Sequence, residues 1–197
     1  MPTSSALKHL AFLLRLSSSA DIARRYFVVN GFDGSLTMLG LATGFRLSES
    51  ANLETAFWAC TGTAVALATS GVSSAYISES AERRRALQDL EGAMAGESLS
   101  ASAHGRAARL APFFIALVNG GAPLLLAFAV TLPIWLGLQG IPLPLEPLDT
   151  AIAVAFGEIA LLGAFLGSIS GTHWLWMSLK TLAIAAVTAA IILLIGR

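Results

Sequence analysis

The sequence predicts an all-α integral membrane protein with five transmembrane helices and an N-terminal amphipathic surface helix. Its 197 residues are 55% hydrophobic and 12% charged, whereas a soluble domain has about 25% charged residues. Five stretches also reach the roughly 20 mostly apolar residues that a helix needs to cross the hydrocarbon core. Because backbone groups cannot remain unpaired in lipid, each of these stretches is expected to be helical.

Residues 1–25 are expected to form an N-terminal amphipathic cytoplasmic segment. Apolar residues recur there at helical spacing with charged residues beside them, which is typical of a helix lying on the membrane surface. Asp21 is expected to start a turn, with Arg25 one helical turn later as an ion-pair partner. The apolar positions are Leu7, Leu10, Ala11 and Leu14.

Residues 26–197 are expected to form the five-helix membrane domain, with a cytoplasmic loop at 78–111. In that loop, Glu79–Leu90 is typical of a helix continuing from the second span, and Glu91–Gly105, rich in Gly, Ala and Ser, is typical of a linker. The third span contains three prolines, so a tilt or kink is expected near Pro123. The five expected spans are Tyr26–Phe45, Thr55–Ile77, Pro112–Leu138, Thr150–Ile169 and Leu175–Ile195.

The distribution of Lys and Arg predicts the orientation of the chain. Ten of the twelve basic residues precede the first span, lie between spans two and three, or lie near the start of span five. Only Arg46 and Arg197 fall on the other side. Cytoplasmic loops carry an excess of Lys and Arg, so the N-terminus is expected in the cytoplasm and the C-terminus on the opposite side.

Charge and motifs exclude several function classes. Twelve Lys and Arg balance twelve Asp and Glu, which leaves no basic excess for nucleic-acid binding. Cys60 is the single cysteine, so it forms no internal disulfide and builds no metal site alone. The chain has no glycine-rich phosphate loop with lysine and no paired histidines at helical spacing. We therefore expect neither an enzyme nor a resident cofactor.

Asp33 is the first ionisable residue expected inside the membrane. Such residues are costly and mark functional sites by default. Asn30 and Met38 lie near it in the sequence, together with Ser35 and Thr37. Carboxylate, amide and hydroxyl oxygens suit a divalent cation, and the Met38 sulfur adds a soft ligand. The alternative interpretation is that Asp33 caps a helix break or forms a hydrogen bond to another span.

Glu158 is the second such residue, in the middle of the fourth span. It could be a second metal ligand, a proton carrier, or a carboxyl group kept neutral by burial. Asn119, beside two glycines in span three, could supply a carbonyl oxygen to a metal, although hydrogen bonding between helices is the favoured interpretation. Glu79 and Glu82 could collect cations at the cytoplasmic mouth, and the competing interpretation is a solvated helix face.

Several short motifs, in order along the chain, resemble the vacuolar iron transporter family, which includes the nodulin-21-like proteins. The resemblance covers most of the chain from about Arg24 onward and identifies a divergent, short member. The motifs are Asp33-Gly34-x-Leu36 followed by Leu39-Gly40 and Gly44, Ser74-Ala75-Tyr76-Ile77-Ser78, Gly120-Gly121-Ala122-Pro123-Leu124, Gly163-Ala164, and Ala185-Ala186 through Ile195-Gly196-Arg197.

The resemblance implies a dimeric, proton-coupled exporter of ferrous iron or manganese from the cytoplasm. Asp33 matches an Asp that helps to bind the metal in the family. Ala75 stands where the family has a metal-binding Glu, and one Glu79-x-x-Glu82 pair remains of its acidic insertion. Glu158 could replace the missing carboxylate if spans one and four meet within a protomer or at a dimer axis, since a divalent ion in a low dielectric needs a second charged ligand.

Two alternatives stay open beside a divalent metal transporter. One is a non-transporting small membrane subunit of a larger complex that keeps the family fold and its small-residue packing motifs. The other is a carrier for a different solute. If the chain is a transporter, Asp33 and Glu158 should face a shared polar cavity.

Overall fold

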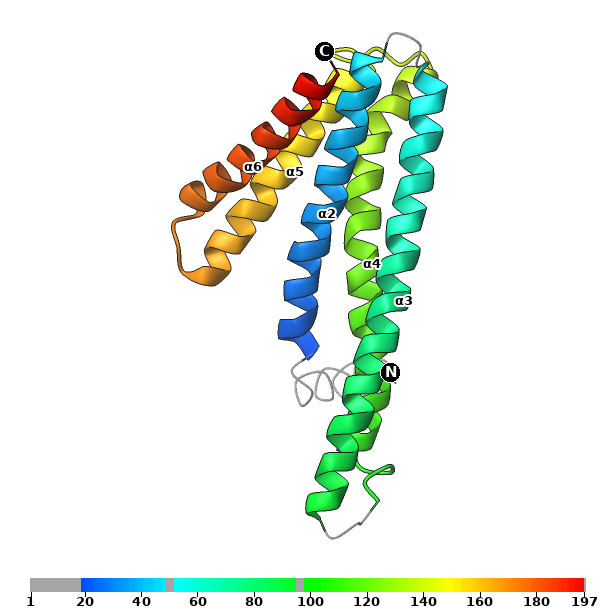
Figure 1. Cartoon of the computed structure of the whole chain (residues 1–197), viewed down its shortest axis with the longest axis vertical. Coiled ribbons are helices and arrows are strands. Elements are labelled where there is room, and N and C mark those ends of the chain that lie inside the picture. The colour runs from blue at the N-terminus through cyan, green and yellow to red at the C-terminus, as the bar shows by residue number, and fades with distance from the viewer. Residues whose placement is uncertain (1–18, 49–51, 95–97, 197) are drawn as a thin grey trace, which may run out of the picture. The chain divides into compact units, whose positions relative to one another are not determined.

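The computed structural model describes residues 19–48, 52–94 and 98–196, and this part of the chain is all-α. It contains five helices, shown in chain order in Figure 1. The predicted surface helix within residues 1–18 lies outside the described residues. The helices are α2 (Ser19–Leu47), α3 (Leu53–Ala93), α4 (Ala103–Leu138), α5 (Pro147–Ser170) and α6 (Trp174–Ile195).

Three of the described helices, α4, α5 and α6, are long and apolar enough to cross a membrane. This indicates a membrane protein. Helices α2 and α3 do not reach the same hydropathy. The middle of α2 carries Asn30 and Asp33, and the apolar half of α3 is rich in Ala, Gly, Ser and Thr, whose small or polar side chains lower the mean hydropathy.

The start of α2 corrects one sequence prediction. Residues 19–25 are helical and continuous with the first expected span, so Asp21 does not start a turn. Its carboxylate lies 3.1 Å from the guanidinium of Arg24, three residues on, and not beside Arg25 as predicted. An acidic residue in the first turn of a helix interacts favourably with the helix dipole, which favours a helix beginning here.

The connection between α3 and α4 is shorter than predicted. Helix α3 continues to Ala93, which confirms the predicted helix over Glu79–Leu90, and α4 begins at Ala103, within the expected linker. The backbone N–H of Leu99 donates to the Glu91 carboxylate at 2.7 Å, which ties the two ends of the turn together. Helix α4 stays a single helix through all three of its prolines.

The chain divides into two compact units, each built from parts of several helices. Among the described residues, unit 1 comprises 19–27, 69–94 and 98–121, and unit 2 comprises 28–48, 52–68 and 122–196. The core of unit 2 contains small residues at four-residue spacing, such as Ala56, Cys60 and Ala64 on α3. Small side chains at this spacing form one helix face and allow neighbouring backbones to approach closely.

Close approaches in unit 2 occur at glycines. A Cβ added to Gly34 would lie 2.8 Å from the Cα of Pro123, and one added to Gly163 would lie 2.8 Å from the Cα of Ser178. Helices α5 and α6 run antiparallel and side by side (Figure 1), joined by a turn at Gly171 with φ of 69°. A positive φ strains residues with a Cβ, so glycine fits this turn.

In unit 1, α3 and α4 also approach closely at glycines. A Cβ on Gly71 would lie 2.9 Å from the Cα of Gly120. Beside this contact, the Asn119 Nδ2 donates to the Gly71 carbonyl at 2.7 Å. Gly71, Ala75 and Glu79 are all buried and follow each other at four-residue spacing along α3, so they share one face of that helix.

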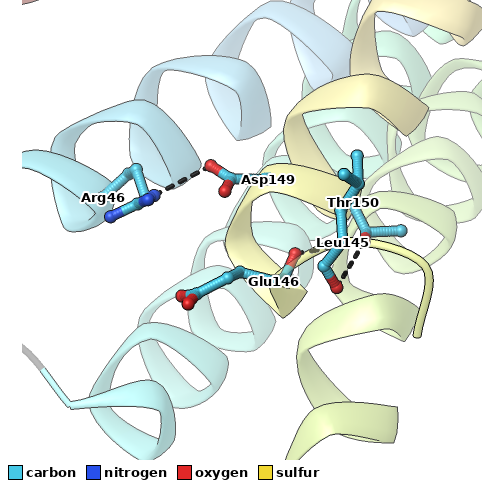
Figure 2. Close-up of polar contacts among 5 residues, drawn as sticks. All are labelled: Arg46, Leu145, Glu146, Asp149 and Thr150. Carbon is cyan, nitrogen blue, oxygen red and sulfur yellow. Dashed lines mark hydrogen bonds and ion pairs between the residues drawn. The ribbon is translucent and has the colours of Figure 1, made fainter. Parts of the chain in front are cut away.

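An exposed ion pair joins the end of α2 to the start of α5 within unit 2 (Figure 2). The Arg46 Nε donates to Asp149 Oδ1 at 2.8 Å, and this hydrogen bond raises the pKa of the Arg46 guanidinium. In the first turn of α5, the Thr150 hydroxyl donates to the Glu146 carbonyl at 3.1 Å. The sequence patterns did not predict the ion pair between Arg46 and Asp149.

Candidate functional site

The candidate site is a buried carboxyl group at the contact between α2 and α5 in unit 2. Glu158 is 8% exposed and lies in the apolar middle part of α5. Ser35, which is fully buried, donates its hydroxyl to Glu158 Oε2 at 2.8 Å. The other oxygen, Oε1, is buried and has no hydrogen-bond partner among the described residues.

Apolar side chains pack tightly against α2 one turn away from this hydrogen bond. A Cβ on Gly31 would lie 3.0 Å from Leu126 Cδ1 and 3.4 Å from both methyl groups of Leu162. Gly31 precedes Ser35 by four residues and Leu162 follows Glu158 by four, so each lies one turn along the same helix face. A buried polar oxygen without a partner costs about 1–3 kcal/mol, and such a group in a native protein suggests a bound proton, water or ion.

Asp33 does not share this environment. Its residue is exposed on the single chain, and it lies two residues before Ser35, which is about 200° around the helix. The prediction that Asp33 and Glu158 face one polar cavity is therefore wrong within a single chain. The physical reason is that the helical periodicity directs Ser35, and not Asp33, toward α5.

Two other predicted ligands on α2 have different surroundings. Met38 is fully buried in the hydrophobic core of unit 2, beside Leu39 and Ala42. Its thioether therefore fills core space, whereas Asp33 is exposed. Asn30 is only partly buried, whereas Met38 is fully buried.

The three predicted ligands in unit 1 differ in their contacts and exposure. Asn119 bonds to the Gly71 carbonyl, as its packing interpretation requires. Glu79 is 8% exposed and lies 3.7 Å from the Arg83 guanidinium on the next turn of α3. Glu82 is exposed, as expected for a solvated face.

The described part of one chain holds no complete metal site. Within residues 19–48, 52–94 and 98–196, no group of three or more His, Cys, Asp and Glu side chains lies close enough to hold a metal ion. Glu158 thus offers one carboxyl group with one hydrogen bond. Further ligands would have to come from outside the single chain, from backbone carbonyls or from water.

Ser35 contacts Glu158, and the sequence pattern does not reveal this contact because Ser35 lies beside Asp33 along the chain. Its signal was its position four residues after Gly31, on the face that glycines open for close contact.

Comparisons of the chain with protein-family models, with curated proteins and with solved structures return no match.

Proposed function

We propose that this protein is a divalent metal transporter of the vacuolar iron transporter type, which moves ferrous iron or manganese out of the cytoplasm in exchange for protons. The observation that carries the proposal is the buried Glu158 carboxyl with its unpartnered Oε1. Ionisable groups inside membrane helices are expensive and commonly mark ion or proton pathways. A carboxyl group with one free oxygen can hold either a proton or a cation.

The proposal includes five membrane spans, with α2 and α3 crossing beside the three more apolar helices. These helices have 29 and 41 residues, or about 44 Å and 62 Å at 1.5 Å per residue, and the hydrocarbon core is about 30 Å thick. Ser35 and Thr43 on α2 are buried, so these polar groups avoid lipid. The excess of basic residues at 1–25 and 78–111 supports an N-terminus in the cytoplasm and a C-terminus on the opposite side.

A homodimer completes the proposal. Asp33 is exposed on the single chain, and a carboxylate facing lipid is costly. A second copy packed on this face of α2 would bring two Asp33 carboxylates together and supply ligands that one chain lacks. Crowded carboxylates hold a proton until a cation displaces it, which links metal movement to proton movement.

The test is metal-dependent quenching of a dye inside proteoliposomes that contain the purified protein, with ferrous iron and manganese under a pH gradient. Asp33→Asn and Glu158→Gln should each reduce the transport rate at least about tenfold, since each removes a charged ligand or proton site at nearly constant volume. Glu54→Gln, which changes an exposed carboxylate at the start of α3, is the matched control. Wild-type rates in both site variants would refute the proposal.

The second candidate function is a non-transporting membrane subunit. Two observations favour it: Met38 lies in the apolar core, and Thr181 and Ala185 are the buried residues of α6, so most of this apolar helix is open to lipid or a partner. If purified, folded protein moves neither ion, co-purification from membranes should identify a partner that covers α6.

A further inference from the structure

A basic groove lies between α3 and α4 within unit 1, where no predicted metal ligand lies. It encloses about 1030 Å³ and is lined by Arg84 and Arg85 from α3 and by Arg109 from α4. Tyr76 and Phe113 lie at the same groove. This volume lies just above the range of about 300–1,000 Å³ that is typical of small-molecule sites.

The charge of the groove favours an anion. The residues that line it include three arginines and a single acidic residue, Asp89. Arg109 donates one N–H to the Ser100 carbonyl at 3.0 Å, which positions the side chain and leaves other donors available. Arg84 and Arg85 are exposed, and neither has an ion-pair partner in the part of the chain that the structure describes. Guanidinium groups match the geometry of phosphate oxygens.

The aromatic and apolar side chains beside the arginines favour a lipid over a free anion. The Tyr76 and Phe113 rings lie 4.8 Å apart and are both exposed, as expected for aromatic residues at a membrane interface. One turn beyond Phe113 on the same helix, Leu117 is 69% exposed, which offers an apolar surface for an acyl chain. Arg109 lies about 6 Å from Phe113 along α4, on the other side of the aromatic pair from Leu117.

We propose that this groove binds the phosphate headgroup of an anionic phospholipid, with the guanidinium groups on the phosphate and an acyl chain along Phe113 and Leu117. Basic pockets beside membrane helices recognise anionic headgroups in this way. The proposal requires insertion in a bilayer and does not depend on metal transport.

The test is native mass spectrometry of the full chain in detergent, titrated with phosphatidylglycerol and, in parallel, with phosphatidylcholine of the same acyl chains. Phosphatidylglycerol should bind at least about tenfold more tightly. The triple variant Arg84→Gln/Arg85→Gln/Arg109→Gln should weaken phosphatidylglycerol on the order of a hundredfold, at about fivefold per arginine. The double variant Arg84→Gln/Arg85→Gln keeps the Arg109 contact to Ser100 and should weaken phosphatidylglycerol binding about 25-fold.

The matched control is Arg24→Gln/Arg25→Gln/Arg106→Gln, which removes three arginines that do not line the groove. It should leave phosphatidylglycerol affinity within about twofold of wild type. Equal affinity for the two lipids, or an equal loss in the control, would overturn the proposal. Displacement of phosphatidylglycerol by soluble glycerol phosphate would overturn the lipid assignment in favour of a free phosphate compound.

Discussion

Removing the Ser35 hydroxyl should destabilise the protein, and the effect should depend on Glu158. In the wild type, Ser35→Ala deletes the hydrogen bond to Glu158 Oε2 and leaves both carboxyl oxygens of a buried side chain without a partner. Loss of a buried partner costs about 1–3 kcal/mol, while measured polar contacts between membrane helices average about 0.6 and reach about 1.7 kcal/mol. We therefore expect a loss of about 1–2 kcal/mol.

The same substitution should be nearly silent once the carboxyl group is absent. Glu158→Met has a similar length and removes the unpartnered Oε1, so alone it should be neutral or stabilising, since apolar replacement of poorly satisfied buried groups often is. In the Glu158→Met background, Ser35→Ala should change the free energy of unfolding by less than about 0.5 kcal/mol.

The assay is reversible unfolding in mixed detergent micelles, followed by the fluorescence of the four tryptophans, for the wild type, both single variants and the double variant. The interaction energy from this cycle should be about 1 kcal/mol. A value near zero, with Ser35→Ala equally costly in both backgrounds, would refute the assignment of Ser35 as the partner of Glu158.

Two further predictions concern packing and use the same unfolding assay. Gly34→Ala should lower the free energy of unfolding by about 1–3 kcal/mol, because its Cβ would clash with the Pro123 backbone, which moves less easily than a side chain. Gly62→Ala is the control, because a Cβ there meets nothing within 4 Å; it should be neutral or stabilising by up to about 1 kcal/mol. Asn119→Leu should cost about 0.5–1.5 kcal/mol through the lost bond to the Gly71 carbonyl, and an unchanged midpoint would contradict that role.

Sequence patterns predicted the helices better than their ends. The structure confirms that α3 continues through Glu79–Leu90. This could be predicted because helix propensity depends on the residues of the segment itself. The turn predicted at Asp21 was wrong, because an acidic residue is as compatible with the first turn of a helix as with a turn before one. Similarly, the Gly, Ala and Ser residues at 91–105 read as linker, although Ala103–Gly105 belong to α4.

The structure gives the surroundings of the predicted site residues and leaves their role as metal ligands a prediction. The position of Glu158 in the middle of an apolar span identified it as a buried polar group, and the structure agrees. Asp33 and Glu158 were predicted to face a shared polar cavity, and the α2 residue that contacts the Glu158 carboxyl in the structure is Ser35. Met38 likewise looked like a ligand from its distance along the chain, yet it points into the core.

The sequence by itself determined the class of this protein: a chain with 12% charged residues and long apolar helices has to bury those helices in lipid or in each other. Helical periodicity also determined which residues of one helix share a face. Only the tertiary structure decided which faces meet, because the rotation of a helix about its axis depends on contacts with residues far away in the sequence. That rotation, set in α2 by the close packing of Gly31 and Gly34, directs Ser35 toward Glu158 and leaves Asp33 exposed on the single chain.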